Sequence, residues 1–165
     1  MRQNAKAWGS TARRYGEEVG TWCRELGCSS VLDYGCGNGS LRDTLPRDIG
    51  YAGYDPAVTG KFELPKGDYD MVACIDVMEH VEEEYVEQVL DQIFDAAEKA
   101  VFFLISCVPA KAVLPDGRNA HITIKDAGEW FDLLTSRYDW EFQKSILTPK
   151  FIQFIGRKRS YYDVE

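Results

Sequence analysis

The most regular feature of the chain is an alternation between short apolar runs and longer segments with helical periodicity. The apolar runs predict strands at residues 31–34, 51–55, 70–76, 100–107, 140–146 and 151–156. The run at 70–76 is almost continuously apolar, which is typical of a central parallel strand that is covered on both faces. The pattern therefore predicts a sheet whose middle strands are buried.

Apolar residues recur at helical spacing in four other segments, namely residues 10–26, 41–45, 81–97 and 126–138. Ser10 is a suitable N-cap for the first of them, and Gly27 is a suitable residue to end it. Glu82, Glu83 and Glu84 fall in the expected first turn of the third helix, where the helix dipole favours negative charge. This acidic run is therefore predicted to be a solvated helix start.

The connections between these elements differ in length. Only about a dozen residues separate Asp55 from the strand at 70–76, and a crossover usually takes at least ~10–12, so a third strand near 62–64 is predicted to be reduced or absent. Residues 109–124 form a long irregular segment, and such loops are often functional. The turn at 147–150 is too short for a parallel crossover, so the last two strands should pair antiparallel.

Strands that alternate with helices predict an α/β protein with a doubly wound, mostly parallel sheet and an antiparallel C-terminal strand. Residues 1–165 are expected to form a single domain, with an N-terminal helical segment at 1–29 and the core at 30–165. Ligands of such sheets bind outside the carboxyl ends of the strands. We therefore expect the functional site at that edge.

The charge balance narrows the possible partners. The chain has 165 residues with 19 basic and 27 acidic side chains, a formal net charge of -8, which argues against a broad surface for nucleic-acid phosphates. Residues 1–6 lack the apolar core of a signal peptide, and no run approaches the ~20 apolar residues of a membrane span. We expect a soluble, cytoplasmic protein without a membrane partner. The pattern does not specify an oligomeric state.

Cysteine usage gives no sign of a disulfide framework or a metal. The five cysteines, Cys23, Cys28, Cys36, Cys74 and Cys107, are odd in number and contain no CxxC pair. This favours reduced, mostly buried thiols. The two histidines lie far in sequence from Cys23 and Cys28, so the spacing does not match a tetrahedral zinc site, and no metal is expected.

A candidate ligand loop follows the first predicted strand, in the stretch Asp33-Tyr34-Gly35-Cys36-Gly37-Asn38-Gly39-Ser40. Glycine adopts positive φ at low steric cost and lets a ligand approach the backbone closely. Dinucleotide-binding and S-adenosylmethionine-binding folds both place glycines here and an acid about 20 residues later, which Asp55 matches. The alternate glycines depart from the GxGxxG spacing of dinucleotide sites, and Asp33 suits a ligand with a positively charged amino-acid end.

The sequence resembles the class I S-adenosylmethionine-dependent methyltransferases in several motifs. The family's first motif, its ribose-binding acid and the DxxEH segment of its small-molecule members are similar to Asp33-x-Gly35-x-Gly37-x-Gly39, Gly53-Tyr54-Asp55-Pro56 and Asp76-Val77-Met78-Glu79-His80. More narrowly, LDYGCG, YDP, DVMEH and DGRNAH in this order resemble small free-standing methyltransferase-like proteins of bacteria and phages. The family's third strand, with its adenine-facing residue, has no counterpart, because Asp68 does not align with it.

The resemblance implies a Rossmann-like fold that binds S-adenosylmethionine through Asp33, Gly35, Cys36, Gly37, Gly39, Asp55, Pro56, Asp76 and Val77. His80 and His121 are the candidate catalytic residues, because an imidazole with a pKa near ~6.5 can take a proton from an acceptor near neutral pH. Glu79, Arg118 and Asn119 are the candidate substrate-binding residues. The structural alternatives are that His80 starts a helix, that His121 stabilises the loop, that Arg118 is a surface charge beside an Asp-Gly turn, and that Asp33 caps the glycine loop.

These features predict methyl transfer to a small-molecule acceptor with an oxygen or nitrogen nucleophile and an anionic group nearby, which Arg118 would hold. The alternative is a non-catalytic S-adenosylmethionine-binding or regulatory module, which would suit the small size of the chain. The glycine spacing disfavours a nucleotide-dependent oxidoreductase. The negative charge and the lack of an added recognition domain make methylation of nucleic acid the least favoured reading.

Overall fold

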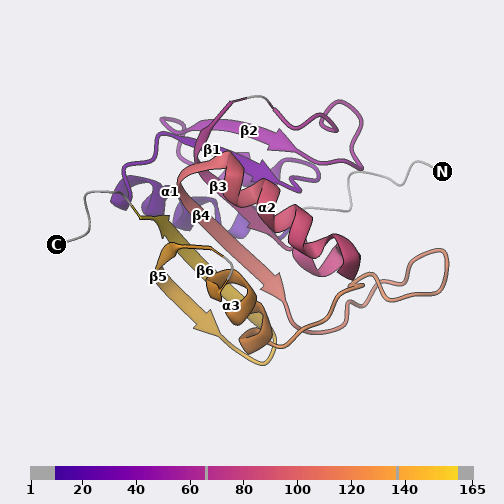
Figure 1. The fold of residues 1–165 in the computed structure, drawn as a ribbon. Coiled ribbons are helices and arrows are strands. Elements are labelled where there is room, and N and C mark those ends of the chain that lie inside the picture. Colours follow the sequence, from indigo (N-terminus) through magenta and orange to yellow (C-terminus); the bar gives the residue numbers. More distant parts are fainter. Residues whose placement is uncertain (1–9, 66, 137, 160–165) are drawn as a thin grey trace.

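A computed structural model of the chain describes residues 10–65, 67–136 and 138–159, which fold around one six-stranded sheet (Figure 1). The strands are β1 (Ser30–Tyr34), β2 (Gly50–Tyr54), β3 (Tyr69–Ile75), β4 (Ala97–Ser106), β5 (Trp140–Leu147) and β6 (Phe151–Lys158), in the order β2-β1-β3-β4-β6-β5. The first four strands are parallel, and β6 pairs antiparallel with both β4 and β5. The predicted α/β sheet with an antiparallel C-terminal pair is confirmed.

Helices cover both faces of this sheet. They are α1 (Gly16–Glu25), α2 (Val86–Ala96) and α3 (Ala127–Ser136), together with the short 3-10 turns η2 (Ala12–Arg14), η3 (Ser40–Asp43), η4 (Met78–His80) and η5 (Glu83–Tyr85). Helices α2 and α3 lie on one face, and α1 lies on the other (Figure 1). The molecule is therefore a three-layer arrangement, as a doubly wound fold requires.

The strand β3 shows how the two cores are built. Val72 and Cys74 belong to the cluster under α2 and α3, whereas Met71, Ala73 and Ile75 belong to the cluster under α1. Successive side chains of a strand point to opposite faces, so a strand buried on both sides needs apolar residues at every position. Fully burying a Val or Ile side chain contributes roughly 1.5–3 kcal/mol, which explains why the sequence is apolar throughout this run.

The first helix begins later than the sequence predicts. A continuous helix was expected from a cap at Ser10, but only a 3-10 turn forms at residues 12–14, and α1 begins at Gly16. The Thr44 hydroxyl donates a hydrogen bond to the Arg13 carbonyl (2.6 Å), so this carbonyl serves a tertiary contact and not a helical one. A Cβ on Gly16 would lie 2.2 Å from Thr44 Oγ1, so the glycine is needed for this close approach.

The third predicted helix, at 81–97, is also shorter. Val81 is extended, with φ -81° and ψ 135°, and α2 begins at Val86, so Glu82 and the η5 residues precede it instead of forming its first turn. The Thr123 hydroxyl donates to the Val81 carbonyl at 2.6 Å. A contact with a residue 42 positions away therefore decides where the helix starts.

The two unusual connections follow the expectations. Residues 61–65 contain no strand, so β2 is the edge strand of the described sheet. The segment between β4 and α3 is irregular and extends beyond the carboxyl end of β4, with one isolated bridge between Val113 and Asn119 (Figure 1).

All five cysteines are buried free thiols. In the part of the chain that the structure describes, no helix is long and apolar enough to cross a membrane.

Candidate active site

The candidate site lies at the carboxyl edge of the parallel strands. The glycine loop follows β1, Asp55 follows β2, the segment Asp76 to His80 follows β3, and the long loop follows β4. These four segments meet at one edge because the four strands run parallel (Figure 1). The topology therefore places the sequence motifs where ligands of such sheets bind.

The glycine loop has a backbone that side chains would obstruct. Gly35, Gly37 and Gly39 have φ values of 77°, 49° and 81°, in the left-handed region that glycine adopts most readily. A Cβ on Gly35 would lie 2.4 Å from Cγ2 of Val77. Val77 therefore packs directly against the loop, and Gly35 is needed for this contact.

Asp55 holds the loop from the end of β2. Its Oδ2 accepts a hydrogen bond from the Gly37 N–H (2.9 Å), and its Oδ1 accepts one from the Ala57 N–H (2.8 Å). Pro56 is exposed in the turn that follows. The sequence analysis considered Asp33 as the residue that could cap the loop, and in the structure Asp55 does so. Each carboxylate oxygen can accept more than one hydrogen bond, so Asp55 retains capacity for ribose hydroxyls.

Asp33 lies within the protein, with only 1% of its surface exposed. The Tyr51 hydroxyl donates to its Oδ2 at 2.9 Å. Burial raises the pKa of this carboxyl to about 7, although the Tyr51 hydrogen bond and the nearby Lys61 charge lower it. Asp33 thus braces Tyr51 in this conformation, and its contact with a cofactor amino group stays a prediction.

Cys36 contributes to the loop through its backbone. Its thiol is buried, and a Cβ on Gly53 would lie 2.9 Å from its sulfur. Burial raises the pKa of this thiol to about 11, so it is not a nucleophile near neutral pH. The expectation that Cys36 is a small residue that fits beside the loop agrees with this packing.

Lys61 was not identified from the sequence, and it lies over the glycine loop. Its Nζ donates to the Gly37 carbonyl (3.2 Å) and would lie 3.0 Å from a Cβ on Gly39. No motif in the sequence marks this lysine. An ammonium group beside open glycines and the Asp55 carboxylate forms a donor and acceptor set that fits the carboxylate and ribose hydroxyls of S-adenosylmethionine.

The segment after β3 begins with a strained residue. Asp76 has φ 61°, which costs a residue with a side chain roughly 1–2 kcal/mol. Its N–H donates to the Leu104 carbonyl (2.8 Å), and its Oδ2 accepts from the Thr11 hydroxyl (2.9 Å). Strain of this kind is typical of functional segments that the surrounding structure holds in place.

Glu79 differs from the prediction of a substrate-facing carboxylate, because its side chain is completely buried. Its Oε1 accepts a hydrogen bond from the Ser106 N–H at 2.9 Å. Its Oε2 has no hydrogen-bond partner among residues 10–65, 67–136 and 138–159. Burial, and secondarily the Asp76 charge, raise the pKa of Glu79 well above its ordinary value.

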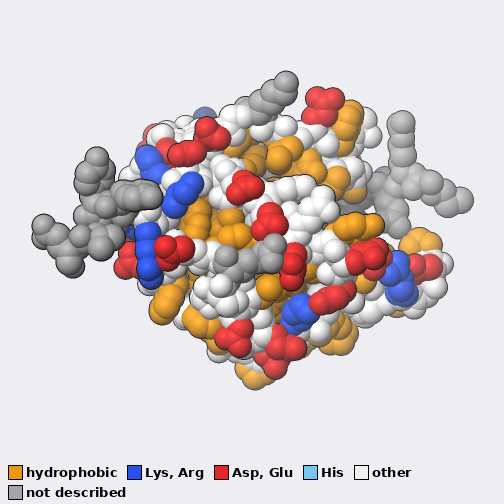
Figure 2. Space-filling model, in the orientation of Figure 1, with side chains coloured by type: hydrophobic (Ala, Val, Ile, Leu, Met, Phe, Trp, Pro, Cys, Tyr) orange, Lys and Arg blue, Asp and Glu red, His pale blue; other side chains and the backbone are white. Residues whose placement is uncertain are grey.

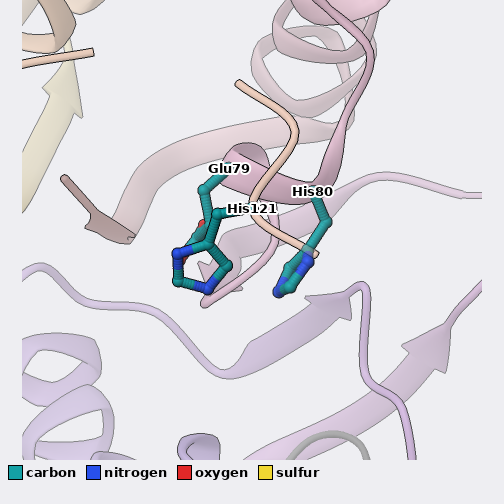
Figure 3. A group of neighbouring side chains, drawn as sticks. All are labelled: Glu79, His80 and His121. Atoms are coloured by element: carbon teal, nitrogen blue, oxygen red, sulfur yellow. The ribbon is translucent and has the colours of Figure 1, made fainter. Parts of the chain in front are cut away.

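The two histidines, both expected at this edge of the sheet, lie against each other. Their ring centroids are 4.9 Å apart in an edge-to-face arrangement, and both lie beside Glu79 (Figure 3). His80 Nδ1 lies 2.7 Å from the Ala120 carbonyl, and His121 Nδ1 lies 2.6 Å from the Val108 carbonyl. Burial lowers the pKa of His80, which favours its neutral form near neutral pH.

The long loop fixes this pair through groups that the sequence analysis had not identified. Thr123 donates its N–H to the Glu79 carbonyl (3.0 Å) and its hydroxyl to the Val81 carbonyl (2.6 Å). Together with the contact between His80 and Ala120, these bonds attach the loop to the segment after β3. Only the fold could reveal this role, because an isolated threonine in a loop carries no motif.

Asn119 and Arg118 are used within the loop, unlike their expected role as substrate contacts. The Asn119 side chain accepts from the N–H groups of Ala110 and His121 and donates to the Ala110 carbonyl, each at 2.9 Å. The Arg118 guanidinium pairs with Glu82 and Asp116, both at 2.8 Å. Asn119 thus positions His121, and Arg118 secures the loop tip.

Comparison with known proteins agrees with the fold. Residues 5–156 match a family described as "Methyltransferase domain". A comparison with curated protein sequences gives no match.

Solved structures resemble the fold at low sequence identity. Magnesium protoporphyrin IX methyltransferase from Synechocystis PCC 6803 with bound SAH is 15% identical, with a TM-score of 0.63 over 89% of this chain and 83% of that one. The 1,6-didemethyltoxoflavin-N1-methyltransferase of Burkholderia thailandensis is 15% identical, with a TM-score of 0.61 over 96% and 82%. Mitomycin 7-O-methyltransferase is 16% identical, with a TM-score of 0.62 over 93% and 56%. At this identity the likeness concerns the fold.

Proposed function

The chain belongs to the methyltransferase domain family and is an S-adenosylmethionine-dependent methyltransferase, and we propose that it methylates an oxygen or nitrogen atom of a small-molecule acceptor. The acceptor would lie between the glycine loop and the His80–His121 pair. The observation that carries this proposal is the continuity of one short segment. Val77 packs against Gly35 of the glycine loop, and His80, three residues later, lies against His121.

The glycine loop side of the site supports binding of the cofactor. When bound, S-adenosylmethionine supplies a methyl group on a sulfonium, which is already activated for transfer to a nucleophile. Asp55 would accept hydrogen bonds from its ribose hydroxyls, and Lys61 would pair with its carboxylate. Such charge-assisted bonds fix an orientation, and orientation of the reacting groups can lower a barrier by roughly 7–11 kcal/mol.

The histidine side supports handling of the acceptor proton. A carbonyl oxygen can only accept, so each ring donates Nδ1–H to the Ala120 or Val108 carbonyl, and Nε2 is the nitrogen that carries the lone pair when the ring is neutral. A lone pair at this position can take the proton that an acceptor hydroxyl loses. Proton transfer to a positioned imidazole typically contributes 10²–10⁴-fold in rate, roughly.

The acceptor class is proposed from charge and from the neighbouring structures. The net charge is -8, and the face that carries α2 and α3 shows acidic side chains spread widely, with basic ones only in small groups (Figure 2). The solved neighbours are named for magnesium protoporphyrin IX, 1,6-didemethyltoxoflavin and mitomycin, which are small molecules. An anionic group on the acceptor would have to displace Glu82 and Asp116 from Arg118.

The proposal is tested in two steps. Calorimetric titration of S-adenosylmethionine into Asp55→Ala should show affinity at least roughly 10-fold weaker than wild type, because a hydrogen bond to a charged group contributes ~1.5–3 kcal/mol. Asp116→Ala, at the exposed loop tip, is the matched control and should bind like wild type. Equal affinity of wild type and Asp55→Ala would remove the ribose assignment.

The second step measures S-adenosylhomocysteine formation with separate panels of hydroxyl- and amine-bearing small molecules and of RNA and DNA. Turnover with members of the small-molecule panel, lost in the double variant His80→Asn/His121→Asn while cofactor affinity stays, is the expected result. Turnover confined to the nucleic-acid panel would contradict the small-molecule assignment.

A further inference from the structure

The three side chains of Glu79, His80 and His121 form a cluster with the composition of a metal site. One nitrogen of each ring and one carboxylate oxygen all lie within 4.8 Å of one another (Figure 3). Two of the residues come from the segment after β3, and the third comes from the long loop. The sequence analysis considered only spacing with cysteines and expected no metal, because Glu79 and His80 lie 42 and 41 positions from His121 and give no local pattern.

The orientation of both imidazoles suits metal binding. Nδ1–H of His80 donates to the Ala120 carbonyl, and Nδ1–H of His121 donates to the Val108 carbonyl. Histidines that bind metals almost always donate their other ring N–H to a carbonyl or carboxylate, which fixes the ring and the tautomer. With Nδ1 used in this way, Nε2 is the ring nitrogen that would bind the ion.

The buried carboxylate supplies an independent observation. Glu79 is 0% exposed, and its Oε2 lacks a hydrogen-bond partner within the described ranges 10–65, 67–136 and 138–159. Leaving a buried polar atom unsatisfied costs roughly 1–3 kcal/mol, and more for a charged group. A cation bound by the Glu79 carboxylate would remove that cost, whereas the Ser106 N–H satisfies only Oε1.

We propose that Glu79, His80 and His121 bind a divalent transition-metal ion of the Zn²⁺ type, which holds the acceptor of the proposed methyl transfer. A set of two imidazoles and one carboxylate favours Zn²⁺ or Fe²⁺ over Mg²⁺. Three protein ligands also leave one coordination position open. Tetrahedral zinc with bonds of ~2.0–2.1 Å sets its ligand atoms roughly 3.4 Å apart. Because the candidate ligand atoms lie within 4.8 Å of one another, the side chains need to close in by at most about 1.4 Å.

This inference rests on the proposed function for its chemistry. When bound, the ion would lower the pKa of an acceptor hydroxyl at the open position, and the proton of that hydroxyl would go to solvent. The new bond forms between that oxygen and the methyl carbon, while the bond from the methyl carbon to sulfur breaks and its electron pair stays on sulfur. In this arrangement the histidines would act as ligands, and the ion would act as a Lewis acid that makes a general base unnecessary.

The first test measures the metal alone, without cofactor or acceptor. Calorimetric titration of Zn²⁺ into the full chain, stripped with EDTA, should show one equivalent bound. His121→Asn and Glu79→Gln should each weaken the affinity by about 10-fold to 100-fold or more. The matched controls are Glu83→Gln, an exposed carboxylate nearby, and Cys28→Ser, which tests the buried Cys23 and Cys28 thiols. Neither control should change the affinity.

A second readout keeps the test valid if a variant folds poorly. Saturating Zn²⁺ should raise the melting temperature of wild type and of both controls but not of His121→Asn, because only a ligand bound by the native state stabilises it. Absence of saturable binding in wild type, or loss of binding in Cys28→Ser alone, overturns the inference.

Failure of the proposed function looks different. If zinc binding depends on the three residues but no small molecule is methylated, the metal site is supported and the proposed function is contradicted. If methyl transfer proceeds at an unchanged rate in EDTA and still depends on the histidines, the proposed function is supported and the metal site is contradicted.

Discussion

The proposed site has two halves. The cofactor half comprises the glycine loop with Asp33, Asp55 and Lys61, and the acceptor half comprises Glu79, His80 and His121. Each half contains a buried carboxyl group, and the surroundings of the two groups differ. In the cofactor half, Asp33 accepts from Tyr51 while Asp55 and Lys61 bond to the glycine loop itself. In the acceptor half, Glu79 has one oxygen bonded to Ser106 and the other without a partner in the described chain. The carboxylates of the cofactor half are therefore hydrogen-bonded within the described chain, whereas one oxygen of Glu79 is not.

The difference has a physical origin. In the cofactor half, backbone conformation next to β1, with positive φ at the glycines, shapes the loop, and the side chains of Asp55 and Lys61 hold it. The acceptor half depends on side chains that a loop after β4 brings onto the segment after β3. Under the proposed function, one half would bind a constant cofactor and the other, assembled half would vary with the acceptor, as expected of one fold that serves many substrates.

The buried carboxyl group of Asp33 predicts the largest change in stability. With a folded pKa of about 7 against an ordinary 3.8, Asp33 keeps its proton in the folded state between about pH 4 and pH 7, while the unfolded chain loses it. Stability contributed by the protonated form is therefore complete below about pH 4 and falls as pH rises through 7. Relative to wild type, Asp33→Asn should gain up to roughly 4 kcal/mol over this range, measured by urea unfolding.

Asp70→Asn is the control with the opposite sign. Although burial raises the Asp70 pKa, the backbone and hydroxyl of Ser29 and the Lys99 charge lower it to about 2. Its removal should change the pH profile only below about pH 4. Parallel profiles for wild type and Asp33→Asn from pH 4 to 8 would show that Asp33 is ionised in the folded protein.

The backbone conformation of the glycine loop predicts the second-largest loss of stability. Gly35→Ala should lower stability by roughly 3 kcal/mol, because φ 77° costs ~1–2 kcal/mol and the new methyl group overlaps Val77. Thermal unfolding should show this as a loss of roughly 6–12 °C. Cofactor affinity should fall as well.

Gly27→Ala separates the two causes of that loss. Gly27 has φ 65°, but a Cβ there meets nothing within 4 Å, so its substitution should cost only the backbone part, ~1–2 kcal/mol. Adding Val77→Ala to Gly35→Ala should recover part of the overlap, because the two residues touch. Equal losses for Gly35→Ala and Gly27→Ala would mean that Val77 moves away without cost.

The difference between local and long-range contacts explains which features could be predicted from the sequence. The strands and the glycine loop were predicted correctly because apolar runs and glycine spacing act within a few residues. The start of α2 was wrong because Thr123, 42 residues away, holds Val81 extended. The grouping of Glu79 with both histidines, and the position of Lys61 over the loop, depend on tertiary contacts in the same way.

The smallest effect should come from the bond that joins the loop to the acceptor half. Thr123→Val keeps the shape of the side chain but leaves the Val81 carbonyl without the hydroxyl that bonds to it, which should cost roughly 1–2 kcal/mol. Thr135→Val, which removes a hydroxyl bond to the Phe131 carbonyl one turn earlier in α3, is the matched control. Its cost should be smaller, because that bond lies within a single helix.

Hydrogen exchange locates the change, because the Thr123 N–H that bonds to the Glu79 carbonyl should exchange about 10-fold faster in Thr123→Val. Affinity for S-adenosylmethionine should not change, since none of these groups touches the glycine loop. A loss of cofactor affinity in Thr123→Val comparable to that in Gly35→Ala would mean that the halves are coupled, because Val77 belongs to the segment that Thr123 secures. Unchanged affinity with faster exchange would show that the acceptor half can loosen while the cofactor half stays formed.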